Sequence, residues 1–236
     1  IAFNADATFL GFLDFPTEEA KKKAPRDNPP QNKLRIIDLR DFSEKEFENV
    51  RSFSFSGENP RWIAINLSTP RPDRSKEAGK GTDLLLYNLN TGATFNLGNV
   101  TSFSFNKSGQ WFAYIVDAYG KAGNGVFLRN MQTGETLAPE SDKASYQSLN
   151  WNREGTALIA LKGVEDKAWK DELFSIVGFR DFDRTPRKVV YNPANDSTFP
   201  EGMTISSNRM PMWSDDLQSF VFGIRSVEKK EEPARN

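Results

Sequence analysis

One pattern recurs five times along the chain, and it restricts the fold more than any other feature of the sequence. Each copy has an aromatic residue, a small polar turn and then a short apolar segment that is typical of a buried strand. The copies begin at Phe3 (FNADATFLGF), Phe55 (FSGENPRWIAI), Phe105 (FNKSGQWFAY), Trp151 (WNREGTALIAL) and Trp213 (WSDDLQSFVF). A repeat at this spacing predicts similar supersecondary units packed side by side.

A second apolar segment follows four of the copies. These segments are Leu34–Leu39, Leu84–Leu89, Val126–Met131 and Leu173–Ile176. Gly109 and Gly155 suit a tight hairpin turn between the first two strands, because Gly reaches positive φ without steric cost. Asn59 can play the same part in the second copy, whereas Ala7 and Leu217 stand where Gly is expected. We therefore expect the turn type to differ between copies.

A unit of about 40–50 residues with four short strands is typical of a β-propeller blade. We predict an all-β fold, a partial β-propeller of about four and a half blades of four-stranded antiparallel sheet. Residues 1–236 then form a single incomplete propeller domain. A two-sheet sandwich is the alternative, but it does not predict the same motif five times. An open arc leaves two apolar faces exposed, so we expect further sequence to close the ring. The alternative is that the arc packs on another chain, including a second copy in a homo-oligomer.

Composition excludes several classes of function. The chain has no His and no Cys, so it cannot assemble a Ser-His-Asp triad, a thiol nucleophile or a His- or Cys-ligated metal site. We expect no catalytic residue, no metal site and no cofactor in this chain. Lys and Arg number 31 against 32 Asp and Glu, a net charge of −1, which gives no electrostatic reason to expect nucleic acid or an anionic membrane as a partner.

The aromatic residues of the repeat are best explained by packing between blades, since burying such a ring removes about 150–250 Å² from water. The structural repeat positions are Phe55, Phe105, Trp151, Trp213, Gly109 and Gly155. Trp169 lies outside the repeat in a charged insertion, Lys167–Asp171. We favour packing for Trp169 as well, and keep it as the one candidate for contact with a substrate or partner.

Two carboxylate pairs, Glu18–Glu19 and Asp215–Asp216, could be interpreted as glycosidase residues. Neighbouring Asp residues in a turn more often accept hydrogen bonds from backbone amides, and Glu18–Glu19 suits the first turn of a short helix. Two insertions interrupt the repeat: Thr17–Asn32, which could begin as that helix, and Phe179–Asn208, an excursion within the fourth blade.

The repeats resemble the N-terminal propeller of bacterial serine peptidases in the prolyl oligopeptidase family. The resemblance covers nearly the whole chain and is clearest in Val100–Gly109, Gly123–Leu128 and Asn208–Asp216. It implies a propeller that restricts entry to an active site in a C-terminal α/β-hydrolase domain, and a periplasmic or secreted location. This chain has no Gly-x-Ser-x-Gly motif, so none of that family's catalytic residues can be placed on it.

We therefore expect a non-catalytic propeller segment of a serine peptidase, which admits short peptides to a triad on a further domain. On this hypothesis the partner is a peptide substrate, and the chain alone is not an enzyme. The alternative is a stand-alone binding propeller whose two insertions grip a protein partner. A propeller glycosidase that uses central carboxylates is a further alternative.

Overall fold

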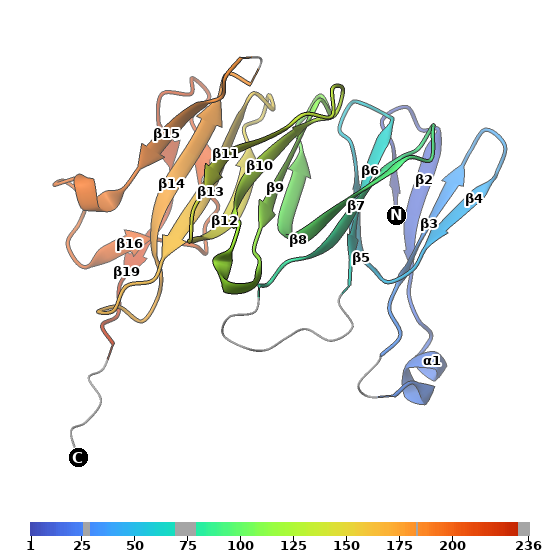
Figure 1. Cartoon of the computed structure of the whole chain (residues 1–236), viewed down its shortest axis with the longest axis horizontal. Coiled ribbons are helices and arrows are strands. Elements are labelled where there is room, and N and C mark those ends of the chain that lie inside the picture. Colours follow the sequence, from blue (N-terminus) through green and yellow to red (C-terminus); the bar gives the residue numbers. More distant parts are fainter. Residues whose placement is uncertain (26–28, 69–78, 183, 231–236) are drawn as a thin grey trace.

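The computed structural model describes residues 1–25, 29–68, 79–182 and 184–230, and these residues form an arc of antiparallel sheets (Figure 1). The fold is nearly all β and the arc is not closed, as the repeat predicts. The described strands form two four-stranded sheets, β1 to β4 and β12 to β15, and between them a seven-stranded sheet, β5 to β11, in which two four-stranded units share β8. All three follow the sequential order of a meander, and two two-stranded sheets of short strands make a fifth unit. We call these units blades 1 to 5 and the strands of a complete blade a to d.

The strands of the blades follow in chain order. Blade 1 consists of β1 (Ala2–Phe3), β2 (Phe9–Asp14), β3 (Lys33–Asp38) and β4 (Glu44–Phe47). Blade 2 consists of β5 (Val50–Phe55), β6 (Trp62–Leu67), β7 (Thr82–Asn88) and the first part of β8 (Thr94–Phe105). The rest of β8 opens blade 3, with β9 (Trp111–Val116), β10 (Gly125–Asn130) and β11 (Thr136–Ser141).

Blade 4 consists of β12 (Ser145–Trp151), β13 (Ala157–Val164), β14 (Leu173–Arg180) and β15 (Arg187–Tyr191). Blade 5 consists of β16 (Met203–Ile205), β17 (Met212–Trp213), β18 (Phe220–Val221) and β19 (Ile224–Ser226). In it β16 pairs with β19 and β17 with β18, so blade 5 is a broken hairpin that corresponds to strands a and b. The helical segments are α1 (Glu18–Lys23), η1 (Tyr119–Lys121) and η2 (Pro193–Asn195).

The turn between strands a and b is the same in four blades and differs in blade 2, so our expectation that the turn type differs between copies holds for blade 2 alone. In each of the four blades, the fourth residue donates its amide to the carbonyl of the first: Ala7 to Asn4 (3.1 Å), Gly109 to Asn106 (3.0 Å), Gly155 to Asn152 (2.9 Å) and Leu217 to Ser214 (3.0 Å). Ala7 and Leu217 adopt φ of 54° and 57°. In blade 2 the turn is one residue longer, and Gly57 (φ 48°), not Asn59, has positive φ.

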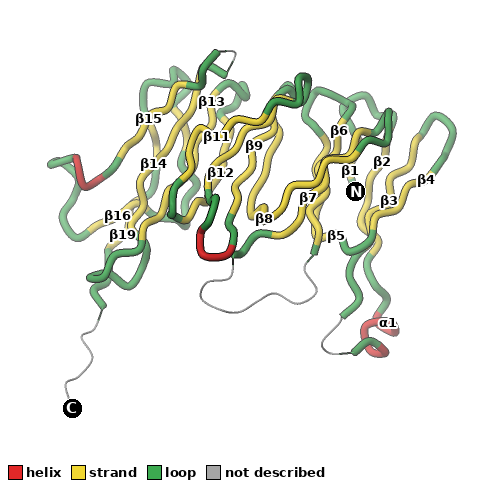
Figure 2. Tube along the Cα trace, viewed as in Figure 1, coloured by secondary structure: helices red, strands yellow, loops and turns green. Residues whose placement is uncertain are grey.

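The connections divide between two edges of the arc. Because the strands alternate in direction, the a–b and c–d turns share one edge, and the b–c connections and the links to the next blade share the other. We call these the turn edge and the b–c edge. The b–c edge carries α1 and η1, which lie below the sheets in Figures 1 and 2. The longer and more varied segments are therefore gathered on one side of the molecule.

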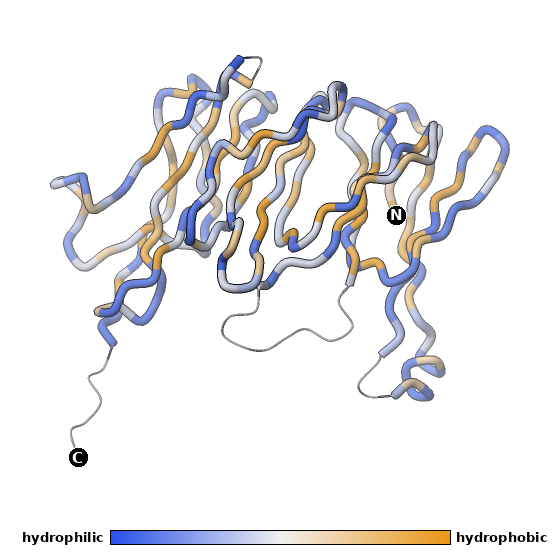
Figure 3. Tube along the Cα trace, viewed as in Figure 1, coloured by the Kyte–Doolittle hydropathy of each residue, from blue (hydrophilic) through white to orange (hydrophobic). Residues whose placement is uncertain are grey.

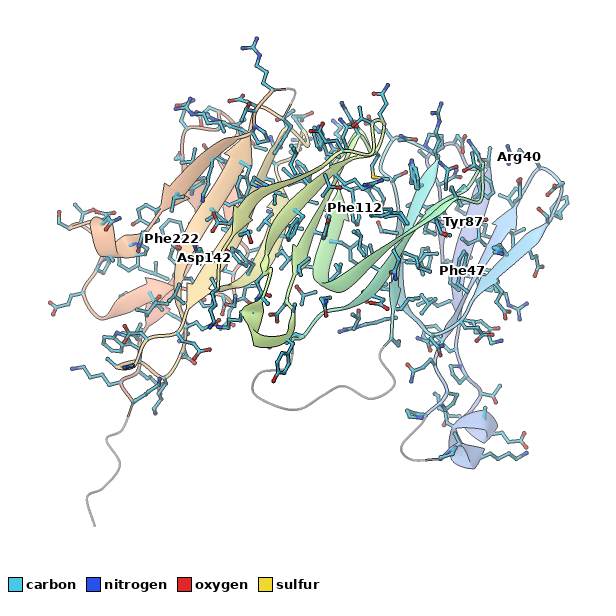
Figure 4. All side chains as sticks on the ribbon, in the orientation of Figure 1. Arg40, Phe47, Tyr87, Phe112, Asp142 and Phe222 are labelled. Atoms are coloured by element: carbon cyan, nitrogen blue, oxygen red, sulfur yellow. The ribbon has the colours of Figure 1, made fainter. Side chains whose placement is uncertain are left out.

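The core lies between blades as four apolar clusters, one at each junction of neighbouring sheets. The b strands contribute most, since Trp111–Ile115 of β9 and Ala157–Leu161 of β13 are buried without interruption. The hydropathy colouring shows the same pattern, with apolar stretches in the strands and polar ones in the turns (Figure 3). Away from the inner strands, Phe47 of β4 packs edge-on against Tyr87 of β7, with ring centroids 5.1 Å apart (Figure 4).

The insertion expected at Phe179–Asn208 is partly wrong. Phe179 and Arg180 still belong to β14, and β15 (Arg187–Tyr191) pairs with β14 as the outermost strand of blade 4. Only the segment after β15 leaves the sheet, where it forms η2 before blade 5 begins. The helix expected at the start of Thr17–Asn32 is confirmed as α1, which Thr17 caps by accepting the Ala20 amide.

Candidate functional site

A cavity of about 470 Å³ opens at the b–c edge, where blades 4 and 5 meet. Its walls come from segments far apart in the sequence: the connection after β6, strand a of blade 4, the loop between β13 and β14, and the residues around β19. The lining residues that matter below are Lys80, Gln147, Trp169, Glu172, Ser207 and Arg225. The site thus depends on the packing of neighbouring blades and not on one local motif.

Trp169 is held at this cavity by backbone pairing. It forms an isolated antiparallel bridge with Lys229. On either side the Lys170 amide donates to the Glu228 carbonyl and the Lys230 amide donates to the Ala168 carbonyl, both at 2.9 Å. The loop of blade 4 is therefore clipped to the segment that follows blade 5. The ring is partly buried and lines the cavity, so it both packs and presents an aromatic surface to a ligand.

The charged groups around Trp169 are arranged in pairs. Lys170 contacts Glu228 at 3.1 Å and Arg225 contacts Asp171 at 3.0 Å. These pairs leave little net charge for a ligand to neutralise. Gln147 and Ser207 add neutral polar groups to the wall. This combination suits a polar, extended ligand that needs hydrogen bonds and an aromatic contact.

Strand a of each blade lies at the inner side of the arc. Neighbouring inner strands are in contact, as β12 is with β8, and the indole N–H of Trp151 donates to the Ser104 carbonyl at 3.3 Å. In blades 2 to 4, polar residues dominate the accessible part of these strands: Arg51, Ser52, Ser54, Thr101, Ser102, Ser104, Gln147 and Ser148. A chain that passes along the inner side would meet polar groups at each of these three blades.

The repeat residues lie at the blade junctions. Phe55, Phe105 and Trp151 each end strand a of their blade, and Trp213 ends β17. The indole N–H of Trp213 donates to the Leu158 carbonyl of blade 4 at 3.0 Å. Gly109 and Gly155 have φ of 69° and 72° in the turns. A Cβ at Gly109 would lie 2.4 Å from the Ser56 carbonyl oxygen of blade 2, so this turn also needs Gly for close blade packing.

The two carboxylate pairs lie on opposite edges of the arc and do not face a common site. Glu18 and Glu19 begin α1 at the b–c edge and contact Lys21 (2.8 Å) and Lys23 (2.6 Å). Asp216 lies in the a–b turn of blade 5, where it accepts hydrogen bonds from the Ser214 hydroxyl (2.6 Å) and the Gln218 amide (3.0 Å). Both pairs stabilise local structure.

Within the described ranges no three acidic side chains gather in a group that could hold a metal ion. In the same part of the chain no helix is both long and apolar enough to cross a bilayer.

Sequence reasoning missed two features. One is Glu140 of β11, a buried carboxylate that contacts Lys162 and Lys188 of blade 4. The other is a bulge that recurs in strand a of three blades. The signal for the bulge was present in the nearly identical segments VRSFSF (50–55) and VTSFSF (100–105), in which one position changes from Arg to Thr.

No protein-family model matches the chain, and no curated protein matches its sequence. Among solved structures it is similar to the β-propeller domain of the trilobed protease from Pyrococcus furiosus, with 12% identity, a TM-score of 0.51, and coverage of 94% of this chain and 67% of that one. It is also similar to an oligogalacturonate lyase in complex with manganese, with 14% identity, a TM-score of 0.53, and coverage of 93% and 60%. At these identities the similarities show the propeller fold alone.

Proposed function

We propose that this chain is the propeller portion of a serine peptidase, and that it controls the access of short peptides to an active site carried by a further α/β-hydrolase domain. The observation that carries the proposal is a propeller arc whose inner strands in blades 2 to 4 are lined by polar groups and whose b–c edge holds a cavity walled in part by Trp169. The similarity to a propeller that belongs to a protease supports it.

The mechanism proposed for the chain itself is selection and not catalysis. The sheets pack on one another through apolar junctions, and further blades in the full-length protein would close the arc into a ring. The opening of that ring would admit an extended peptide and exclude a folded protein. In the further domain, acyl transfer would use a Ser nucleophile, a His base and an oxyanion hole. Such a peptidase would belong to the prolyl oligopeptidase family and act in the periplasm or outside the cell.

The direct test is activity-based labelling of the full-length protein with a fluorophosphonate probe, followed by assays on a short peptide and on a folded protein that contains the same sequence. We expect one labelled serine outside residues 1–236, cleavage of the peptide and no cleavage of the folded protein. A full-length protein that is neither labelled nor able to cleave peptides would overturn the proposal.

Trp169 provides a test of the cavity. Trp169→Ala in the full-length peptidase is expected to raise KM for a short peptide roughly fivefold, because an aromatic contact contributes about 1 kcal/mol, and to leave kcat nearly unchanged. Phe15→Ala is the matched control, since Phe15 is an exposed aromatic (66%) on the same edge in blade 1. Equal effects of the two substitutions on KM would show that Trp169 does not contact the substrate.

A stand-alone binding propeller is the second candidate. Blade 5 favours it, because Val221, Met212 and Ile224 leave an apolar surface exposed by 43–50%. A hydrophobic surface of this kind suits a protein partner. On this account the full-length protein would not react with the fluorophosphonate probe, and a partner would protect blade 5 from hydrogen exchange.

A further inference from the structure

A bulge recurs at the same place in the inner strands of blades 2, 3 and 4. In blade 2 the pairing passes from Val50↔Leu67 to Ser52↔Asn66, so that Arg51 has no partner across the ladder. In blade 3 it passes from Val100↔Val116 to Ser102↔Ile115 and leaves out Thr101. A bulge of this kind turns one side chain away from the regular sheet and is common beside functional sites.

Blade 4 has the same interruption in a slightly different form. Its pairing passes from Gln147↔Leu161 to Asn150↔Ile159, and Ser148 within the bulge has φ of 59°. Gln147 beside it lines the cavity at the b–c edge. The three bulges therefore form a row along the inner side of the arc, at the end of each strand a that is nearer the b–c edge.

The inner strands of blades 2 to 4 have the sequences VRSFSF, VTSFSF and SYQSLNW, and Arg51 is the only charged residue in them. Its side chain is exposed, and within the described part of the chain it makes no ion pair or side-chain hydrogen bond. By contrast, Arg35 of blade 1 contacts Asp14 (3.2 Å) and Arg225 of blade 5 contacts Asp171 (3.0 Å). A guanidinium without a counter-ion, in a row of neutral hydroxyl and amide groups, is suited to bind an anion from outside the chain.

We propose that Arg51 binds a carboxylate of a peptide that lies along the inner side of the arc, and that this contact selects peptides by charge. The planar guanidinium can donate two parallel hydrogen bonds to a carboxylate. Thr101 and Gln147, presented by the neighbouring bulges, supply polar groups for the adjacent peptide units. The inference rests on the proposed function, because it assigns a peptide to the inner side of the propeller.

The carboxylate has two sources, a free C-terminus or an acidic side chain, and three synthetic pentapeptides separate them. All are N-acetylated: Ala5 with a free C-terminus, Ala-Ala-Glu-Ala-Ala amide, and Ala5 amide as the neutral reference. Binding to the 236-residue chain is measured by isothermal titration calorimetry at low ionic strength. We expect at least one of the two carboxylate peptides to bind about tenfold more tightly than the neutral one, as for a charge-assisted hydrogen bond.

The variant Arg51→Gln is expected to abolish this preference, while Arg187→Gln leaves it unchanged. Arg187 is the matched control because it is an exposed arginine on strand d of blade 4, at the outer side of the arc. Circular dichroism checks that both variants remain folded.

Two outcomes would overturn the assignment. If the neutral peptide binds as tightly as the others, or if Arg51→Gln keeps the preference, Arg51 does not recognise a carboxylate, and peptide binding by the propeller still stands. If no peptide binds, the inference fails, and the labelling of the full-length protein decides the proposed function separately.

Discussion

At the scale of single residues, Phe42 combines two features that are unfavourable for phenylalanine. It adopts φ of 61° in the c–d turn of blade 1, and 75% of its surface is exposed. Gly92 and Gly134 occupy the corresponding position in blades 2 and 3, with φ of 72° and 78°. Each donates its amide back across the turn, as Phe42 does to the Asp38 carbonyl at 2.8 Å. Because the Phe42 side chain is exposed, it buries little apolar surface to offset the strain of its positive φ.

Replacement of Phe42 by Gly is therefore expected to stabilise the chain. The left-handed conformation costs a residue with a Cβ about 1–2 kcal/mol, and the greater entropy of Gly in the unfolded chain takes back about 0.4–1 kcal/mol. Urea denaturation of Phe42→Gly should give an increase of roughly 0.5–1 kcal/mol in the free energy of unfolding. Phe15→Gly is the control, because Phe15 is similarly exposed but has negative φ. A loss of stability in both variants would contradict this account.

The turns also show how far single residues can be predicted from sequence. Gly109 and Gly155 are recognisable because Gly favours positive φ. The positive φ of Ala7 and Leu217 cannot be recognised from these residues themselves, because the signal for it lies elsewhere in the turn. Asn4 accepts the Phe9 amide through Oδ1 at 2.8 Å, and the Ser214 hydroxyl accepts the Ser219 amide at 3.0 Å. A polar residue directly after the repeat aromatic closes the turn, and it predicts the turn better than Gly does.

At the scale of the elements, a buried ionic group joins blades 3 and 4. Glu140 of β11 accepts hydrogen bonds from the Tyr146 hydroxyl and from Lys162 Nζ, both at 2.9 Å, and also contacts Lys188. Lys162 reaches Asp142 at 2.7 Å as well (Figure 4 labels Asp142). Burial raises the pKa of Glu140, but the hydrogen bonds from Lys188, Lys162 and Tyr146 together lower it below the ordinary value of 4.5.

Removal of this charge should weaken the junction. Glu140→Gln leaves Lys188 without this partner and Lys162 with Asp142 alone. The cost should fall below the roughly 3–5 kcal/mol typical of a fully buried pair, because Lys188 is 41% exposed, but thermal unfolding should still occur at a lower temperature. The depressed pKa adds a pH dependence: the contribution of Glu140 is fully present above pH 4.5 and is lost as the pH falls through the folded pKa. The stability difference between the native chain and the variant should therefore shrink below pH 4.5.

Glu154→Gln is the matched control, because Glu154 contacts Lys107 at 2.9 Å on the surface, where an ion pair contributes little. A melting temperature that is equally insensitive to both substitutions would show that the junction does not depend on the Glu140 network.

A strand can be predicted from the sequence where it is buried on both faces, and less readily where it lies at the outer edge of a blade. The apolar run Trp111–Val116 indicates a central strand without ambiguity. By contrast, β15 has the sequence RKVVY and is mostly exposed, so it carries no strong period of two and its sequence alone does not predict a strand. Its place is set by pairing with β14, which is a contact that the local sequence does not encode.

At the scale of the whole molecule, the arc has an apolar surface on the face of blade 5 that points away from blade 4. Phe220 packs inward, against Trp213 at 4.4 Å between ring centroids, while Val221, Met212 and Ile224 are exposed. Val189, Tyr191 and Phe222 line a shallow apolar hollow of about 380 Å³ beside them. Met212 and Val221 are cross-strand partners on the face of blade 5 opposite Trp213 and Phe220, which pack toward blade 4. At the other junctions the next blade covers the corresponding face, so a further blade or another chain is needed to bury this surface.

The isolated 236-residue chain is therefore expected to self-associate through blade 5. Sedimentation velocity at rising concentration should show association in the native chain and a marked reduction in Val221→Lys. Val164→Lys is the matched control, since Val164 is exposed to 51% and Val221 to 50%, but Val164 lies at the end of β13 in a complete blade. Association that persists in Val221→Lys, or is lost equally in Val164→Lys, would place the contact elsewhere.

The repeat predicts this architecture because each blade repeats one buried pattern, whereas the cavity at the b–c edge was not predictable. Its walls come from three blades, and only the curvature of the arc brings Lys80, Trp169 and Arg225 together.

The central claim, a propeller that serves a peptidase domain, is tested most directly by the sequence that follows Asn236 in the gene. We expect further copies of the repeat and then a Gly-x-Ser-x-Gly motif with later Asp and His. A reading frame that stops near Asn236 would contradict the claim and leave a binding propeller.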